Sequence, residues 1–193
     1  MNLKEYTQGA ILTESRIDNV TVDKEKLLIV LALFMEAGNL LDVIKKNAFY
    51  GRAVDTTKWN ERMASICALS SVPTAQLTTE QTDLRTSDLI PVDPRIFHAI
   101  VGIATEGTEL VEALHSMVSG VATQDSVNLK EEGLQDVCWY QAILADALGA
   151  DWEQNLVINL AKLEARNKGK KFNAEATLNR DLESERAILE QAK

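Results

Sequence analysis

The sequence predicts an all-α protein, and its composition and its residue pattern both point that way. Hydrophobic residues make up 46% of the 193 residues but aromatic residues only 5%, so the core must consist mainly of aliphatic side chains, many of them good helix formers. Three prolines and nine glycines are too few for a turn-rich β-sandwich or barrel. Apolar residues recur with helical spacing along most of the chain. We therefore expect a single domain over 1–193, a helical bundle with a long internal loop.

Three helices are expected within residues 1–69. The second of them contains the apolar run LLIVLALFM at 27–35, which leaves it no polar face for two turns, so it must be covered on every side. Nine apolar residues are too few to cross a bilayer. A second copy of the chain is the expected cover, and the long loop 70–93 of the same chain is the alternative. The three helices should span Leu3 to about Thr13, Asp23 to Gly51, and Thr57 to Leu69.

A polar segment without a clear period, 70–93, reads as a long loop, and loops of this length are usually functional or mobile. Asp93 and Pro94 suit the N-cap and the first position of the next helix. The remaining helices are expected at Pro94–Gly120, at Val127–Leu148, from Asp151 to about Gly169, and from Asn173 to the C-terminus over 173–193, with the acidic core in 94–172.

The charge balance limits the classes of partner. With 20 basic and 29 acidic residues the net charge is −9, so the chain lacks the basic footprint that holds nucleic acid. Cys67 and Cys138 are too few for a disulfide framework, and the N-terminus does not have the pattern of a signal peptide. These features predict a soluble cytoplasmic protein with no membrane and no nucleic-acid partner.

Four carboxylates occur as two pairs on consecutive predicted helices. Glu106 and Glu109 are three residues apart, and Glu132 and Asp136 are four apart, so each pair lies on one helix face. Packed antiparallel, the two helices would bring the four together in apolar surroundings, where a hard divalent cation such as Mg²⁺ or Mn²⁺ would offset their repulsion. Ordinary solvated acidic faces would have the same spacing, and spacing alone leaves both interpretations open.

A weak internal repeat relates the two halves of the chain. Residues 36–42 align with 106–112, and Glu61 and Ser65 align with Glu132 and Asp136. The first copy has Asn39 and Ser65 where the second has carboxylates, so only the second half has the full acidic set. Chance similarity between amphipathic helices explains the repeat as readily as duplication does.

Residues 98–172 resemble the MazG-like superfamily of all-α nucleoside triphosphate pyrophosphohydrolases. The resemblance lies in GIATEGTELVEAL, VNLKEEGLQDVCWYQAILADALG and NLAKLEARNKGKKF. The family has an ExxE helix, then a helix carrying a Glu and an Asp, then a basic segment. The N-terminal KKNAFYGR also looks like a family segment, and the tail KFNAEATLNRDLESERAILE looks most like phage-encoded members.

The resemblance implies a metal site. Glu106 and Glu109 match the ExxE ligands, and Asp136 matches the Asp of the second motif. The family usually has Glu three residues before that Asp, where this chain has Gly133; Glu132 is therefore the expected fourth ligand, with Glu131 as the less favourable choice.

The resemblance also implies substrate contacts, since the family holds phosphates with the basic segment. Each group of candidates also has a purely structural explanation. The polar stripe could be a solvated helix face, the basic group could be cations at a helix C-terminus, and the tryptophan could be a core residue. The candidates are Asn159, Lys162 and Arg166 on one polar stripe, Lys45, Lys46 and Arg52 near a helix end, and Trp139 as a stacking partner for the base.

The function so implied is hydrolysis of a (d)NTP to a (d)NMP and pyrophosphate, dependent on Mg²⁺, with dGTP or GTP as the first choice of substrate. Members of the superfamily are typically dimers or tetramers, so a homo-oligomer is expected, in the host cytoplasm if the protein is phage-encoded. A dUTPase-like enzyme, a house-cleaning enzyme for non-standard nucleotides, and a non-catalytic helical assembly module are the alternatives.

Overall fold

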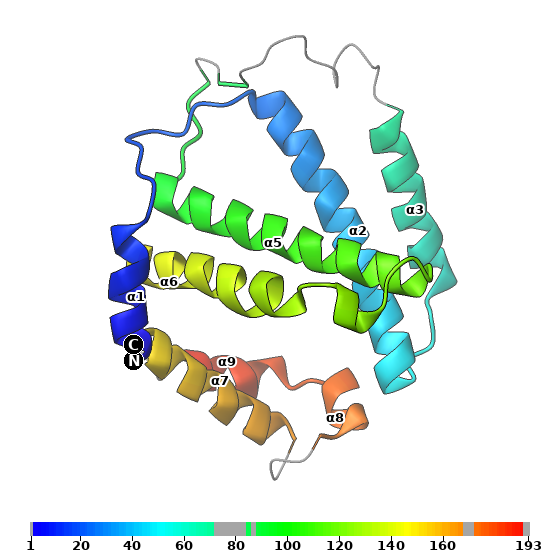
Figure 1. The fold of residues 1–193 in the computed structure, drawn as a ribbon. Helices are drawn as coiled ribbons and strands as arrows, with labels where there is room; N and C mark the ends of the chain where they lie inside the picture. Colours follow the sequence, from blue (N-terminus) through cyan, green and yellow to red (C-terminus); the bar gives the residue numbers. More distant parts are fainter. Residues whose placement is uncertain (1, 72–83, 86–87, 168–171, 191–193) are drawn as a thin grey trace. The chain divides into compact units, whose positions relative to one another are not determined.

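The computed structural model describes residues 2–71, 84–85, 88–167 and 172–190, with only the backbone for residues 125 and 132. The described residues form helices, and their one β feature is an isolated bridge between Thr21 and Leu89. The all-α prediction is therefore confirmed (Figure 1). The elements are α1 (Leu3–Leu12), α2 (Lys24–Tyr50), α3 (Thr56–Ser70), α5 (Pro94–Val118), a 3₁₀ turn (Gln124–Ser126), the π-helical segment η2 (Glu131–Asp136), α6 (Val137–Ala147), α7 (Trp152–Arg166), α8 (Ala174–Leu178) and α9 (Leu182–Glu190).

The chain divides into two compact units, each drawn from separate parts of the sequence. The first unit comprises Met1–Val20 and Pro91–Asn159, and so contains α1, α5, η2, α6 and the start of α7. The second comprises Thr21–Ile90 and Leu160–Gln191, with α2, α3, the end of α7, α8 and α9.

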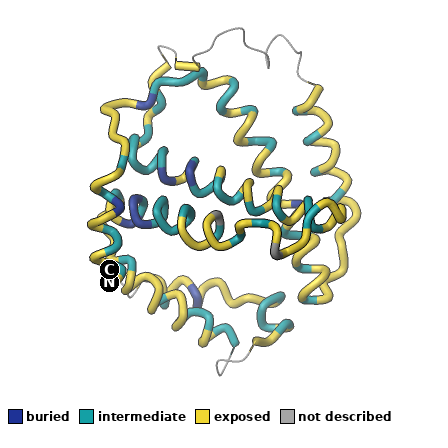
Figure 2. The backbone as a smooth tube through the Cα atoms, in the orientation of Figure 1, coloured by how far each residue is buried: buried dark blue, intermediate teal, exposed yellow. Residues whose placement is uncertain are grey.

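The core of the first unit lies between α5 and α6, which run antiparallel side by side, with α1 packed on α6 (Figure 1). The buried positions gather on α5 and α6 (Figure 2), and several are small residues, Ala99, Ala142 and Ala145, which allow a close approach of the two helices. Ile143 is the largest fully buried side chain among the described residues.

Charged side chains also hold the first unit together. Arg95 at the start of α5 donates to Glu14, which follows α1, and to Asp146 of α6, each at 2.7 Å. Asp93 caps α5 by accepting from the backbone N–H of Arg95 at 2.8 Å, and Pro94 takes the first helical position, as the sequence predicts.

The second unit contains a helical hairpin of α2 and α3. Gly51 ends α2 in the left-handed conformation, at φ 65°, as expected for a helix C-cap. Arg62 of α3 donates to Glu36 of α2 at 2.9 Å. Much of the apolar surface of α2 stays exposed in this unit, including Val30 at 61% and Met35 at 65%.

Two predicted helices differ from the structure. The helix expected from Val127 begins after Asn128, whose side chain accepts from Glu131 N–H at 3.4 Å, and it contains the π-helical segment η2. The single helix expected over 173–193 is interrupted between α8 and α9. Asp181 causes the interruption, because its carboxylate accepts from Ser184 N–H at 3.0 Å and so caps a new helix.

Part of the predicted loop 70–93 lies outside the described residues. Where the structure describes it, the loop follows the start of α2: Asp23 N–H donates to Leu84 O at 3.0 Å, and Val22 N–H donates to Asp88 O at 3.3 Å.

By length and hydropathy alone α2 is long and apolar enough to cross a membrane, a criterion that buried core helices and signal sequences also meet. Glu36 and Asp42 lie along this helix, and both form ion pairs.

Candidate functional site

The candidate site lies where α5 runs antiparallel to η2 and α6, and two close contacts define its register. Gly102 of α5 faces the ring of Tyr140, and Leu110 of α5 lies against Gly133. One turn after Gly102 on α5 is Glu106, and one turn before Tyr140 is Asp136. The two carboxylates therefore sit opposite one another between the two contacts, and Glu109 lies one turn further along α5.

The electrostatics agree with this placement. The pKa of Glu106 is raised above its ordinary value, first by burial and then by the charges of Glu109 and Asp136. No cation among the described residues counteracts this increase. Glu106 and Asp136 are half-buried and Glu109 is exposed, so the group is more open to solvent than the sequence suggested.

The aligned hairpin of the second unit gives an internal comparison. Glu36, the counterpart of Glu106, pairs with Arg62, and Arg62 occupies the position that Gly133 has in the first unit. In this hairpin α3 supplies the positive charge that compensates the carboxylate of α2. In the first unit Gly133 occupies the position of Arg62, so the carboxylates lack that partner.

The π-helical segment η2 sets the spacing before Asp136. A π-helix is hydrogen-bonded i→i+5 rather than i→i+4, so its turn is about one residue longer than an α-helical turn. Glu132, four residues before Asp136, therefore lies about one turn from it along the backbone. Such π-helical insertions are frequent at functional sites.

A cavity of about 620 Å³ lies beside Glu109 and Glu112 of α5. Thr105, Thr108, Ser116 and Asn128 also line it. The hydroxyls of Thr105 and Thr108 donate to backbone carbonyls of α5, at 2.9 and 3.0 Å, so acidic oxygens are the main free acceptors on this wall. Such a surface suits a cation better than an anion.

The donor set of this group consists of oxygens, which suits Mg²⁺ or Mn²⁺. In the described conformation no three or more His, Cys, Asp or Glu side chains among the described residues are close enough to hold a metal ion together. A cation bound here would have to draw Glu106, Glu109 and Asp136 together.

Two aromatic residues follow Asp136. The pKa of Tyr140 is raised by burial and by the charges of Glu106 and Asp136, so its hydroxyl belongs to the acidic group. Trp139, expected to stack on a base, instead donates its indole N–H to Thr13 at 3.0 Å and contacts His98 and Tyr140 edge to face. This arrangement favours the structural alternative for Trp139.

The basic candidates lie in the second unit. Lys45 and Lys46 both pair with Asp42, Lys45 at 2.8 Å, and Asn47 donates to the carbonyl of the exposed Arg52 at 2.8 Å. Lys162 is half-buried on the second-unit part of α7. Asn159 is exposed and ends the part of α7 that belongs to the first unit.

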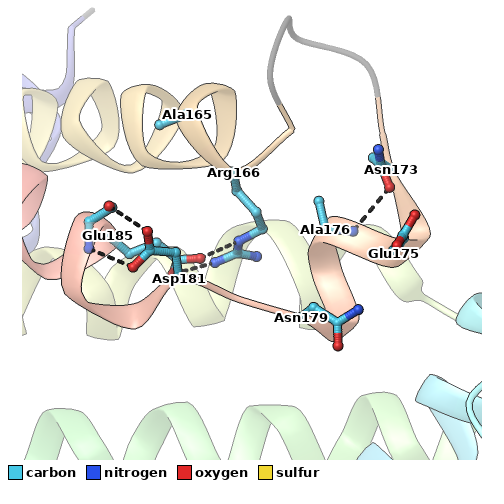
Figure 3. Close-up of a pocket in the computed structure, with 9 residues that line it drawn as sticks. Ala165, Arg166, Asn173, Glu175, Ala176, Asn179, Asp181 and Glu185 are labelled. Atoms are coloured by element: carbon cyan, nitrogen blue, oxygen red, sulfur yellow. Dashed lines mark hydrogen bonds and ion pairs between the residues drawn. The ribbon is translucent and has the colours of Figure 1, made fainter.

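Arg166 is bound to another side chain. Its Nε and Nη2 donate to the two carboxylate oxygens of Glu185 at 2.7 and 2.8 Å, in the wall of a cavity of about 600 Å³ (Figure 3). Arg180 donates to the same carboxylate. A phosphate could reach only the N–H groups of Arg166 that remain free, the two on Nη1 and the second one on Nη2, unless this pair opened.

Comparison of the chain with models of known protein families, with curated proteins and with solved structures found no match.

Tyr140 follows Asp136 by one helical turn, so its place beside the carboxylates follows from the sequence. No sequence signal indicated Tyr6, whose pKa is raised by burial and by the neighbouring Cys138 and Asp136. Tyr6 comes from a helix far away in the sequence, and no local pattern connects it with Asp136.

Proposed function

We propose that this protein is a Mg²⁺-dependent nucleoside triphosphate pyrophosphohydrolase of the MazG-like superfamily, converting a (d)NTP and water to a (d)NMP and pyrophosphate. The observation that carries the proposal is the carboxylate group between α5 and η2, where burial and like charges raise the pKa of Glu106 and no described cation compensates. A group of this kind suits a polyphosphate substrate that is bound as its metal complex.

Glu106, Glu109, Glu132 and Asp136 would hold the metal. Mg²⁺, when bound, offsets the charge of the phosphate oxygens and orients them for attack. One carboxylate of the group would accept a proton from the attacking water.

The π-helical segment supports the assignment of Glu132. The superfamily has Glu three residues before the Asp, whereas here the interval is four. A turn that is about one residue longer absorbs the extra residue and keeps Glu132 near the register of the family's Glu. Glu131, one residue earlier, does not gain from this effect.

Substrate phosphates would be held by basic residues. Lys162 is the strongest candidate, because no ion pair between described residues engages it, whereas Arg166, Lys45 and Lys46 pair with carboxylates. Arg52 and Asn159, both exposed, are further candidates. Trp139 is the weakest candidate, since Thr13 already accepts from its indole N–H.

The proposal includes a homo-oligomer, a dimer or a tetramer. Its support is the exposed apolar surface of α2, on which Leu28, Phe34 and Leu41 are 56%, 50% and 47% exposed. Obligate interfaces are apolar in this way and resemble a domain core cut in half.

The test is pyrophosphate release from a panel of common, deaminated and deoxyuridine triphosphates, with Mg²⁺ and with EDTA. We expect release that EDTA abolishes and that Glu109→Gln removes, with dGTP or GTP turned over best. A preference for dUTP or for deaminated bases would correct the substrate and keep the reaction. No release from any triphosphate would refute the enzyme and leave the helical assembly module as the function.

A further inference from the structure

A second cavity lies in the first unit and is lined by residues of α1, η2, α6 and the start of α7. Its volume is about 660 Å³, within the usual range for small-molecule sites. Tyr6 of α1, Trp152 of α7, and Leu134 and Cys138 from η2 and α6 form apolar walls. Gln135 and Glu153 add polar groups at its edge.

The aromatic walls are shaped for a flat ring. The centroids of Tyr6 and Trp152 are 6.3 Å apart, and their planes are inclined by 48°. The two rings form an angled wall rather than a closed stack, so part of each ring faces the cavity. Stacking on such rings stabilises any nucleobase, because every base has a π-face.

The cavity is close to the carboxylate group. Tyr6 lines the cavity, and the charge of Asp136 contributes to raising the pKa of its hydroxyl. Gln135, in the cavity wall, is adjacent to Asp136 in the chain. One ligand could therefore place its phosphates at the carboxylates and its ring in the cavity.

The polar groups at the edge can recognise a base. The Gln135 amide offers both a donor and an acceptor, and it is exposed. No described hydrogen bond engages it, so it is available to a ligand.

We infer that this cavity binds the nucleobase of the substrate, with Tyr6 and Trp152 as the stacking surface and Gln135 as a specificity-determining residue. The inference rests on the proposed function for the identity of the ligand, but base binding itself requires neither metal nor turnover. The occupant is an aromatic heterocycle, because an aliphatic chain would make no use of the free amide beside the rings.

The test measures binding of uncharged deoxynucleosides in EDTA, where no hydrolysis can occur. The three tryptophans give three indole N–H signals in a ¹H–¹⁵N spectrum, which Trp→Phe variants assign. We expect deoxyguanosine, or the nucleoside of the preferred triphosphate, to shift the Trp152 signal and to leave that of Trp59 unchanged. Ribose at the same concentration should shift neither signal.

Two variants quantify the contribution of the cavity. Trp152→Leu should weaken nucleoside binding about ten-fold, and Gln135→Ala, at an exposed position, should change the ranking of the four nucleosides without altering the fold. Trp59→Leu, the matched control on α3, should have the affinity of the wild type.

The outcomes separate the inference from the proposed function. Pyrophosphate release by the wild type together with unchanged nucleoside affinity and unchanged KM in both variants would overturn the inference and leave the enzyme standing. Nucleoside binding that Trp152→Leu weakens, without turnover of any triphosphate, would support the cavity and refute the pyrophosphohydrolase.

Discussion

At the scale of single residues, the structure distinguishes carboxylates with a cation beside them from those without. Glu185 is buried at 5% exposure and receives hydrogen bonds from Arg166 and Arg180, which lower its pKa to about 2. Glu106 has the opposite shift, because burial and two neighbouring carboxylates raise its pKa. The first arrangement stabilises the fold, and the second leaves negative charge available to a ligand.

Mg²⁺ should raise the melting temperature of the wild type and not that of Glu109→Gln or Asp136→Asn. A ligand that binds only the native state stabilises it by mass action, about 2.7 kcal/mol at a hundred times the dissociation constant. Without metal the two variants should melt at the wild-type temperature or slightly above it, because carboxylate repulsion is relieved. Calorimetric scans measure both effects.

The matched control for this metal effect is Glu61→Gln, an exposed acid on α3 that aligns with Glu132. It should keep the full Mg²⁺ shift. Equal shifts in Glu109→Gln and in the wild type would place the metal elsewhere.

Glu185→Gln should lower the free energy of unfolding by on the order of 3 kcal/mol at pH 7. The folded-state pKa is about 2 against an ordinary 4.5, so the contribution is fully present above pH 4.5 and is lost as the pH falls through 2. Urea unfolding at a series of pH values should therefore show the difference between variant and wild type shrinking below pH 4.5.

Glu190→Gln on the same helix is the control for the Glu185 experiment. Its pair with Arg186 is exposed, with side chains 56% and 79% accessible, and such surface pairs contribute little. We expect a change below about 0.5 kcal/mol. A comparable loss of stability in both variants would mean that burial does not make the ion pairs of Glu185 more stabilising than an exposed pair.

At the scale of elements, the packing of α5 on η2 and α6 sets the register of the site. Small residues on α5 allow the close approach, and Tyr140 fills the space over Gly102. The longer turn of η2 then places the backbone of Glu132 about one turn before Asp136. A change at the contact between Gly102 and Tyr140 should therefore affect helix packing, and a change in η2 should affect metal binding.

Gly102→Ala should destabilise the protein by about 1–3 kcal/mol, the usual cost of overpacking a core. The added Cβ would lie 2.1 Å from Cε1 of Tyr140, whose ring is held edge to face by His98 and Trp139. Gly107→Ala on the same helix meets no atom within 4 Å and should gain up to about 1 kcal/mol from helix propensity. Chemical denaturation measures the free energy of unfolding of both variants. A Gly102→Ala variant as stable as the wild type would contradict the close packing.

Deletion of Gly133 should convert η2 to an α-helical turn and place Glu132 three residues before Asp136. We expect the deletion variant to keep its Mg²⁺-induced thermal shift, because the shorter turn and the shorter spacing compensate. Glu132→Gln should lose the shift, and Glu131→Gln should retain it. The reverse result for the two glutamates would make Glu131 the fourth ligand.

At the scale of the whole molecule, the exposed apolar surface of α2 requires a cover. Several charges along α2 are paired with protein side chains, as in Glu36 with Arg62. The cover that we propose for the apolar surface is a second copy of the chain.

Light scattering at micromolar concentration should give a mass of two or four times 21.3 kDa. Replacing both Phe34 and Met35 by Glu should shift the protein to the monomer, because two charges would enter the interface. Leu12→Glu, at a site that is 86% exposed on α1, should leave the mass unchanged. A monomeric wild type, or one that binds neutral lipid vesicles instead of itself, would refute the oligomer.

The sequence by itself determined the helical class, most helix boundaries and two pairs of carboxylates, because these depend on local signals. Helical periodicity, the Asp93–Pro94 start and the Gly51 end are encoded within a few residues. The i,i+3 spacing of Glu106 and Glu109 likewise follows from helix geometry alone.

Only the tertiary structure decided which residues surround those carboxylates. That Tyr6 lies near Asp136, that Arg166 is bound by Glu185, and that η2 has a π-turn all depend on packing between segments far apart in the chain or on hydrogen bonding that no residue type dictates. Side-chain partners across elements are chosen by the register of helix packing, and a single residue of offset changes every pair along the interface.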